Sequence, residues 1–279
     1  MPVRIVTDSA CDLPESICAD LGVEVVPLTI RFGDREYVDR KELTTDAFWR
    51  ELESSSVLPE TSAPSVGAFE ETFRRLSDEG ADAIVCINLS ARLSATMQSA
   101  QVAAKALDGQ TPIEIIDSFS ASMGIGNLAL HAARRARAGA GLEEIVAEVE
   151  AHRANQHVFA ALDTLEYQRK GGRIGGAQAM LGSMLSIKPI ISVIDGAVEP
   201  AGRVRTRSKA LRFLIDQVPA GKVELISVLH ANAPDVDEFV AMLAPLVPDA
   251  EVTVGTIGPV IGVHTGPRVI GIAWINRQE

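Results

Sequence analysis

Residues 83–118, AIVCINLSARLSATMQSAQVAAKALDGQTPIEIIDS, decide the fold class of this chain. The stretch begins and ends with short apolar runs, AIVCI and IEII, in which β-branched side chains dominate. Such runs are typical of strands that are covered on both faces of a parallel sheet. Between them lies an alanine-rich stretch, residues 94–107, with the composition of a helix. A strand, a helix and a second strand in succession predict an α/β protein.

The same alternation continues toward the N-terminus and beyond the quoted stretch. The remaining elements predicted for the first half are strands at residues 3–9 and 23–33 and helices at residues 66–80, 123–139 and 142–154. In the first of these helices Phe69, Phe73 and Leu76 fall on one stripe, which is the pattern of a helix with one buried face. Gly80 follows this stripe as a helix stop signal.

After about residue 155 the sequence pattern changes, and a second series of predicted strands and helices begins. It predicts helices at residues 205–218 and 233–247 and strands at residues 223–230, 252–266 and 269–275. A chain of 279 residues is longer than most single domains. We therefore predict two α/β domains, residues 1–155 and 156–279, although no linker rich in Pro, Gly or Ser marks the boundary.

The composition argues against several classes of protein. A net charge of −11 disfavours DNA and RNA as partners, because phosphate backbones require a basic face. No apolar run reaches the roughly 20 residues of a membrane helix, and the N-terminus lacks the pattern of a secretory signal. The cysteines Cys11, Cys18 and Cys86 have no metal-like spacing and are expected to be free thiols. We expect a cytoplasmic protein without integral membrane association.

The charge is nevertheless uneven along the chain. The segment from Arg169 to Arg212 contains nine Lys and Arg against two Asp and Glu, a net charge of +7, which leaves −18 for the remainder. Such a basic segment is either a solvated face or the neighbour of an anionic group, and the sequence leaves both interpretations open.

Polar residues follow the first predicted strand in the motif TDSACDLP, residues 7–14. We expect Asp12 to cap the next helix, with Pro14 in its first turn. Asp8 ends the strand and could in principle act as a nucleophile. A role in the turn is favoured, because no partner Lys, second Asp or metal motif accompanies it.

Two further groups of hydroxyl residues precede predicted helices. In TSAPS, residues 61–65, Ser65 is a natural N-cap, which leaves the hydroxyls of Thr61 and Ser62 as candidates to donate to a ligand oxygen. Ser94 opens the alanine-rich helix. It is either a simple N-cap or, with the N–H groups that follow, part of an anion cradle, and the two roles are compatible.

The motif IGPVIGVHTGPR, residues 257–268, places His264 and Thr265 at the glycine-bounded end of the last long apolar stretch. We interpret this position as an exposed turn at a strand end. His264 could be structural or could donate to a carboxylate, and a bound carboxylate would favour its protonated form.

The motifs of common enzymes are not found in the sequence. It contains no GxSxG elbow, no HExxH, no CxxC pair and no Walker loop, and we expect no metal and no cofactor. What remains is a set of hydroxyls, a histidine and helix N-termini, which together are suited to holding an anionic group by hydrogen bonds.

The order of these motifs resembles that of the DegV family. The strings TDSACDLP, TSAPS, LSATMQSA, LEYQRKGGRI, KPI and IGPVIGVHTGP carry the resemblance, which runs from Thr7 to Pro267. It implies two α/β domains with a long-chain fatty acid at their junction, its carboxylate near the junction and its tail in an apolar tunnel. It also implies that the chain is not catalytic alone and presents the acid to a separate ATP-binding kinase subunit, which forms acyl phosphate.

The resemblance carries site residues over motif by motif. It implies that the carboxylate ligands are Thr61, Ser62, Ser94, His264 and Thr265. It also implies that Arg173 and Arg203 face the partner or its phosphate. The sequence departs from the family pattern at Ala95, where Gly is usual, and at Met97, where Tyr is common, and the backbone N–H groups of the cradle survive both changes. It also departs at Arg268, where a small residue is usual and where an extra cation could tighten anion binding or alter the partner contact.

Two other functions remain open from the sequence. A hydrolase or transferase could use Ser94 and His264, provided that these two side chains lie within hydrogen-bond reach of each other. A lipid-responsive regulator is the other alternative, although no DNA-reading helix is recognisable.

Overall fold

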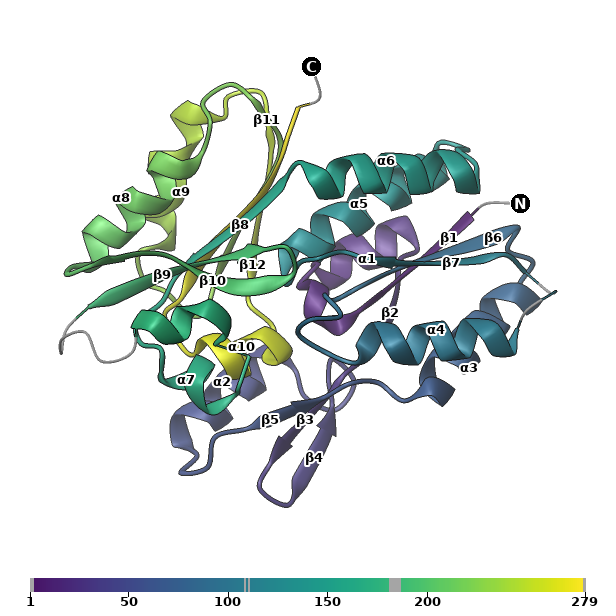
Figure 1. Ribbon diagram of the computed structural model, residues 1–279, viewed down its shortest axis with the longest axis horizontal. Helices are drawn as coiled ribbons and strands as arrows, with labels where there is room; N and C mark the ends of the chain where they lie inside the picture. Colours follow the sequence, from purple (N-terminus) through teal and green to yellow (C-terminus); the bar gives the residue numbers. More distant parts are fainter. Residues whose placement is uncertain (1–2, 108, 110, 181–186, 278–279) are drawn as a thin grey trace.

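The computed structural model describes residues 3–107, 109, 111–180 and 187–277, and it contains three β-sheets with helices packed around them (Figure 1). The two larger sheets lie on opposite sides of the molecule, and the smallest lies below them in this view. The α/β fold class predicted from the sequence is confirmed.

The first sheet is parallel and four-stranded. Its strands, in spatial order, are β2 (Glu24–Val26), β1 (Val3–Asp8), β6 (Ala83–Asn88) and β7 (Ile113–Asp117). All residues of β6 are buried, as its continuous apolar sequence predicts for a central strand covered on both faces. The carboxyl ends of β1, β6 and β7 meet at one edge of the sheet, so the loops after them face the same region.

Helices cover both faces of this sheet. On one face lie α3 (Val66–Asp78) and α4 (Thr96–Ala106), and on the other α1 (Glu15–Leu21), α5 (Met123–Arg137) and α6 (Leu142–Ala154) (Figure 1). The predicted stripe of α3 is confirmed, since Phe69, Phe73 and Leu76 are fully buried. Burying each of these side chains stabilises the fold by roughly 1.5–3 kcal/mol. Ser65 caps α3 as predicted, and its Oγ accepts a hydrogen bond from the N–H of Ala68 at 3.1 Å.

A small antiparallel sheet was not anticipated from the sequence. It contains β4 (Arg35–Val38), β3 (Thr29–Phe32) and β5 (Glu60–Ser62), and α2 (Thr45–Ser54) lies between β4 and β5 along the chain. The single strand predicted at residues 23–33 is therefore wrong. It divides at Pro27, which has no N–H to donate to a sheet, and its two parts join different sheets.

The third sheet is six-stranded and mixed. Its order is β10 (Ala197–Val204), β9 (Lys188–Ile194), β8 (Gln156–Ala161), β13 (Ile270–Asn276), β11 (Val223–His230) and β12 (Glu251–Thr256). Among the described strands of this sheet, only β11 and β12 pair in parallel. On one face of this sheet α8 (Arg207–Gln217) and α9 (Val236–Leu243) bury a second core. The other face is turned toward the first sheet and α5 (Figure 1).

The strand predicted at residues 252–266 is correct only in its first part. The strand β12 ends at Thr256, and a helix, α10 (Pro259–Thr265), follows it. Pro259 occupies the first turn of this helix, where a missing N–H costs nothing. The β-branched residues of α10 mislead a pattern-based prediction, because tertiary packing overrides their weak helix propensity.

Short helical segments complete the described structure. They are α7 (Glu166–Lys170) and the 3₁₀ turns η1 (Ser9–Cys11), η2 (Gly175–Met180) and η3 (Ala244–Leu246). Cys11, Cys18 and Cys86 are buried free thiols, as predicted.

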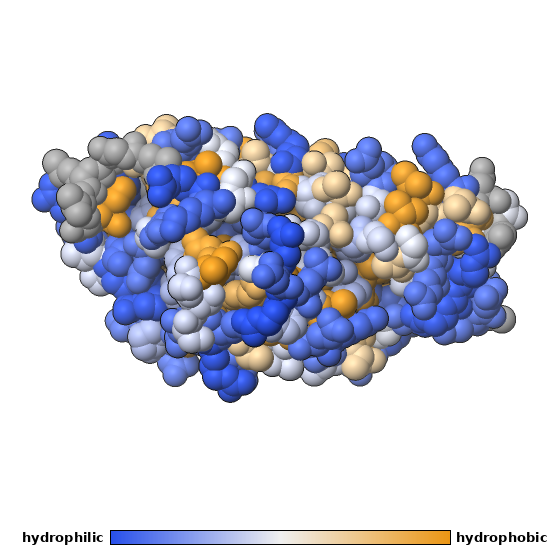
Figure 2. Space-filling model, turned by 90° about the horizontal axis from the view of Figure 1, so that it is seen from below, coloured by the Kyte–Doolittle hydropathy of each residue, from blue (hydrophilic) through white to orange (hydrophobic). Residues whose placement is uncertain are grey.

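The largest core cluster continues from the first half of the chain into the second. It includes Ile5 of β1 and Leu128 of α5 together with Ala273 and Ile275 of β13. The division into domains at residues 155 and 156 stays a prediction, because a shared core does not test whether each half folds alone. On the face in Figure 2, apolar side chains form small patches among polar ones. None of the described helices has the length and apolar content needed to cross a membrane.

Candidate functional site

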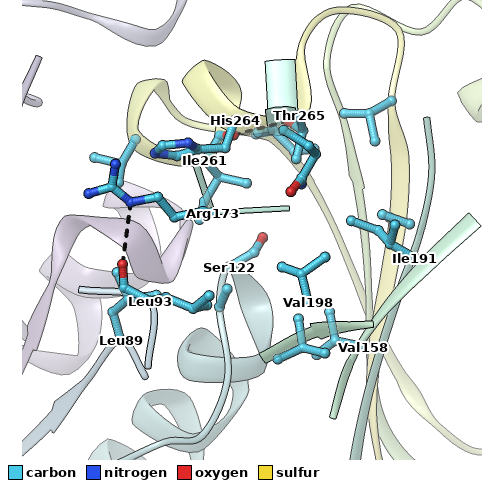
Figure 3. Close-up of a pocket in the computed structure, with 18 of the residues that line it drawn as sticks. Leu89, Leu93, Ser122, Val158, Arg173, Ile191, Val198, Ile261, His264 and Thr265 are labelled. Carbon is cyan, nitrogen blue, oxygen red and sulfur yellow. Dashed lines mark hydrogen bonds between the residues drawn. The ribbon is translucent and has the colours of Figure 1, made fainter. Parts of the chain in front are cut away.

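A cavity lies between the third sheet, α10 and the loops that leave the first sheet (Figure 3). Val158, Ile191 and Val198 contribute from β8, β9 and β10, while Leu89 and Leu93 contribute from the loop after β6. The cavity contains about 970 Å³ of space that no atom fills, its mouth included. Most of its wall is apolar, which suits a hydrocarbon ligand.

The polar groups of the cavity include a hydrogen-bonded pair, Thr61 and His264. Thr61 Oγ1 lies 3.0 Å from His264 Nε2, although 203 positions separate the two residues in the sequence. Strand β5 supplies Thr61 and the last turn of α10 supplies His264. The prediction of an exposed turn at a strand end is therefore wrong for His264, which is helical and largely buried, and for Thr265, which is buried.

His264 is neutral at physiological pH in the empty protein. Burial, and secondly the positive charge of Arg173, lower its pKa to about 4. Its Nδ1 is buried without a hydrogen-bond partner, so Nε2 is the ring nitrogen that can form a hydrogen bond in the cavity. When Nε2 carries the proton, it donates to Thr61 Oγ1, and the hydrogen of the Thr61 hydroxyl is then free to point at a ligand oxygen.

The close approach of His264 requires glycine at position 171. A Cβ at Gly171 would lie 2.3 Å from His264 Nδ1, which is far inside van der Waals contact. Packing against His264 therefore explains the first glycine of the KGGR motif, Gly171. Gly172 is in the left-handed region, with φ of 68°, which accounts for the second.

The structure brings Ser62 and Ser94 to the same cavity. Ser94 is not the N-cap of α4, because Ala95 holds that position. The Ser94 hydroxyl lies 2.8 Å from Thr96 Oγ1 and accepts a hydrogen bond from the Thr96 N–H at 3.2 Å. Ala95, one of the positions at which the sequence departs from the DegV pattern, fits this turn, since its φ is −78°.

Thr265 also lines the cavity, but its hydroxyl already has a partner. Thr265 Oγ1 donates to the carbonyl oxygen of Ile261 at 3.0 Å, one turn earlier in α10. A hydroxyl has a single hydrogen, so in this rotamer Thr265 cannot also donate to a carboxylate. Its role as a head-group ligand remains a prediction.

The two arginines predicted to face a partner lie in different places. Arg173 is exposed at the edge of the cavity and donates to the carbonyl oxygens of Leu93, at 3.4 Å, and Gly171, at 2.9 Å (Figure 3). Arg203 lies on β10, is exposed, and does not line the cavity.

The basic segment is partly neutralised by its neighbours. Its ion pairs join Lys170 to Glu166, Lys188 to Asp163 and Arg207 to Asp235. The cations that form no ion pair with any other described residue are exposed, and they are Arg169, Arg173, Arg203, Arg205, Lys209 and Arg212. These exposed cations fit the interpretation of a solvated face, and the alternative, a neighbouring anionic group, stays a prediction.

Ser122 is a cavity residue that the sequence did not single out. It has φ of 56°, and its Oγ donates to Asp12 Oδ2 at 2.6 Å. Asp12 also accepts a hydrogen bond from the N–H of Gly258 at 2.9 Å, so it joins the start of α10 to the segment that follows β1. The prediction that Asp12 caps α1 is wrong, because no side chain caps that helix. Burial raises the pKa of Asp12 to about 7.

A second unexpected residue is Gln168 of α7. It is buried beside the cavity, and its Oε1 has no hydrogen-bond partner. The sequence offers no signal for it beyond its place next to the KGGR motif. The Ser122 position could have been noticed, because it stands in the SxGxG stretch that follows β7.

The serine hydrolase alternative requires a bond between Ser94 and His264, and this bond is not formed. His264 Nε2 is paired with Thr61, and the Ser94 hydroxyl with Thr96. Among the described residues, no group of metal-ligating side chains lies at the cavity. The geometry is therefore that of a binding site with an apolar wall and a few polar groups.

Comparisons with known proteins agree with this geometry. The chain resembles a DegV domain-containing protein of Streptomyces coelicolor, which is 39% identical over 281 residues, with 99% of each chain covered. The structure resembles a fatty-acid-binding DegV family protein from Thermus thermophilus, with a TM-score of 0.90 and 34% identity over 99% of this chain and 100% of that one.

Two further solved structures are similar. One is DegV, a fatty acid binding protein from Bacillus subtilis, with a TM-score of 0.89 and 29% identity over 99% of this chain and all 100% of the other. Another is a stearic acid-binding protein from Eubacterium ventriosum, with a TM-score of 0.90 and 27% identity over 98% of each chain. The family profile described as uncharacterised protein, DegV family, matches residues 2–277. This match, together with the relative from Streptomyces, shows that the chain belongs to the DegV family.

Proposed function

We propose that this protein binds one long-chain fatty acid, with the acyl tail in the cavity and the carboxylate beside Thr61. The observation that carries the proposal is the pair of Thr61 and His264 in an otherwise mainly apolar cavity. Ser62 and Ser94 supply further hydroxyls in the same cavity. The fatty acids bound by the relatives from Thermus, Bacillus and Eubacterium have the same chemistry.

The energetics of such a complex are favourable. An acyl tail gains roughly 0.8 kcal/mol for each CH₂ removed from water, or on the order of 10 kcal/mol for a tail of about 16 carbons, before ordering costs. A carboxylate buried without partners would cost several kcal/mol. The Thr61 hydroxyl, oriented by neutral His264, can offset part of this cost, as can the serine hydroxyls.

The bound acid is then presented to a separate ATP-binding kinase subunit, which phosphorylates its carboxylate. Arg173 supports this step, because it combines an exposed guanidinium with a position at the cavity edge. The exposed, unpaired cations of the basic segment would favour an acidic partner surface. The chain itself contributes binding and orientation of the acid.

The first experiment identifies the ligand. Protein purified without added lipid is denatured, and its organic extract is analysed by mass spectrometry. We expect fatty acid in nearly equimolar amount. If the extract is empty and the lipid-free protein also fails to take up palmitate and oleate, fatty acid binding is excluded.

A second experiment assigns the carboxylate site. Thr61→Val keeps the shape of the side chain and removes the hydroxyl, so it should weaken fatty acid binding about 10- to 100-fold, the usual cost of a hydrogen bond to a charged group. The methyl ester of the same acid has no carboxylate and serves as the matched control. Wild type and variant should bind the ester equally, and an equal loss for both ligands would place the carboxylate elsewhere.

A further inference from the structure

A second group of polar side chains shares no residue with the cavity lining, and its members on α5, His131 and Arg135, belong to the second half of that helix. It lines an open hollow between α5, α6 and β11, which we call the α5–α6–β11 hollow. The residues that line it are His131, Arg135, Glu148, His152, Glu224, Asp249 and Arg277. Neither the motifs of the sequence nor the proposed fatty acid site accounts for this group.

His152 is the most informative residue of the hollow, because its ring is fixed and one nitrogen is free. Only 6% of its side chain is exposed. Its Nδ1 lies 2.8 Å from the carbonyl oxygen of Glu148, one turn earlier in α6. A carbonyl can only accept, so Nδ1 carries a hydrogen and donates it. In the neutral ring the lone pair is then on Nε2, which is buried in the hollow without a hydrogen-bond partner.

The free nitrogen of His152 faces a carboxylate from another element. His152 Nε2 lies 3.6 Å from Glu224 Oε2, beyond hydrogen-bond distance. Two acceptor atoms that face each other in this way are stabilised by a cation between them. The backbone-bonded second nitrogen is also the usual outer-shell arrangement of a metal-binding histidine, because it fixes the tautomer and the ring direction.

His131 completes a set of three metal-ligating side chains. One ligand atom from each of His131, His152 and Glu224 lies within 4.8 Å of the others. Tetrahedral Zn²⁺ with bonds of about 2.1 Å holds its ligand atoms roughly 3.4 Å apart, so the three side chains have to move closer together to bind the ion. Two His and one Glu with an open fourth position is a common zinc ligand set.

The charges around these three residues favour a cation over an anion. Three carboxylates line the hollow, from Glu148, Glu224 and Asp249, against two arginines. Arg135 is already paired with Glu148, at 2.8 Å, and Arg277 donates to two backbone carbonyls. Glu148 also lies 2.8 Å from His131 Nε2, where it can orient that ring or serve as a further ligand.

We propose that the α5–α6–β11 hollow binds one divalent transition-metal ion of the Zn²⁺ type through His131, His152 and Glu224. The ion would join α5 and α6, which cover the first sheet, to β11 of the third sheet. The fatty acid cavity lies between these same two parts of the molecule. A metal here would therefore stabilise the arrangement that forms the cavity, without taking part in binding the acid.

The proposal is tested on untagged full-length protein that has been stripped with a chelator and returned to metal-free buffer. Zn²⁺ is titrated by calorimetry, and Co²⁺ is added separately to read the ligand field by visible absorption. We expect one saturable Zn²⁺ site per chain and a rise in the melting temperature with Zn²⁺. His152→Ala and Glu224→Gln should each weaken Zn²⁺ binding at least tenfold, since even outer-shell changes cost about 10- to 100-fold.

The controls separate this site from other possible ligands. Glu224→Gln is conservative, and the Glu224 side chain is 41% exposed, so a folding defect is not expected. His230→Gln changes a histidine on the same strand, outside the hollow, and should leave Zn²⁺ binding unchanged. Absence of saturable Zn²⁺ binding, equal binding by wild type and His152→Ala, or stabilisation by inorganic phosphate in place of Zn²⁺ would each overturn the proposal. None of these outcomes depends on whether the cavity holds a fatty acid.

Discussion

The cavity and the α5–α6–β11 hollow each contain a buried histidine, but the two rings have opposite surroundings. His264 has its Nε2 beside the Thr61 hydroxyl, and the charge that acts on it is the cation of Arg173. His152 has its Nδ1 fixed by a carbonyl, and its Nε2 faces the carboxylate of Glu224. The comparison teaches that neighbouring groups, rather than the imidazole itself, decide whether such a site suits an anion or a cation.

The side chains that line the two regions also favour different ligands. The cavity is enclosed mainly by aliphatic side chains, which suits a ligand that is mostly hydrocarbon with one charged end. The hollow is lined by charged side chains, which suits a small ion with several ligands. Changes in one region should therefore leave the other intact, and each of the following experiments measures both.

The largest effect should come from filling the cavity. Val198→Trp places an indole on a wall that an acyl tail would contact (Figure 3). If it excludes about four CH₂ groups from the cavity, the loss is about 3 kcal/mol, or more than a hundredfold in affinity. Binding of oleate to the lipid-free protein, followed by calorimetry, measures this effect.

A variant with a smaller substitution controls for loss of oleate binding through misfolding. Val193 is the cross-strand partner of Val198 and also lines the cavity, so Val193→Phe should weaken oleate binding by a smaller factor. Zn²⁺ binding in the hollow should be the same in both variants. Full oleate affinity in a folded Val198→Trp protein would mean that the tail lies elsewhere.

An intermediate effect should appear in the pH dependence of stability. His264 has a pKa of about 4 in the folded protein and its ordinary value, 6.5, when unfolded. The unfolded chain therefore binds more protons between these values, so the stability that neutral His264 contributes above pH 6.5 is lost as pH falls toward 4. Relative to His264→Gln, wild type should lose about 2 kcal/mol by about pH 5.

The His264→Gln variant is needed as a reference because the titration of Asp12 changes the stability with pH in the opposite direction to that of His264. The pKa of Asp12 is raised to about 7 in the folded protein, so its contribution is present at low pH and is lost as pH rises through 7. This contribution is common to wild type and variant, and it cancels in their difference. Urea unfolding of lipid-free protein at several pH values gives both free energies. A difference that does not change with pH would show that His264 is solvated.

The sequence predicted those parts of the fold that depend on local pattern. The buried stripe of Phe69, Phe73 and Leu76 and the Ser65 cap need only the residues of one helix, and both are confirmed. The segment that forms α10 was mistaken for strand, because its helical state depends on distant packing. Gly262 of α10, for example, lies so close to Phe48 that a Cβ would be 2.6 Å from that ring.

The candidate site was predictable as a set of residues but not as a geometry. All five predicted ligand residues line one cavity. The sequence motifs singled out Thr61, Ser62, Ser94 and His264, and the resemblance to a family added Thr265 as a ligand. The bond between Thr61 and His264 joins residues 203 positions apart, and no local pattern contains it. The same limit applies to the bond from Ser122 to Asp12 and to the three ligating residues of the hollow, which come from three different elements.

The smallest effect on binding should come from replacing Arg173, although its effect on phosphorylation of the acid by the proposed kinase subunit should be large. The guanidinium is exposed and bonded to backbone carbonyls, so Arg173→Ala should change oleate affinity by less than about threefold, as for other solvent-screened charges. If the proposed transfer to a kinase subunit takes place, phosphorylation of bound oleate should fall at least about tenfold in this variant, because close charge pairs at an interface contribute more. Arg203→Ala should reduce this transfer less, since Arg203 does not line the cavity. If Arg173→Ala instead weakens oleate binding tenfold and leaves the transfer per bound acid unchanged, Arg173 is a carboxylate ligand. The carboxylate site of the cavity would then contain a full positive charge in addition to its hydroxyls. Its difference from the α5–α6–β11 hollow, which is lined by carboxylates, would be correspondingly larger.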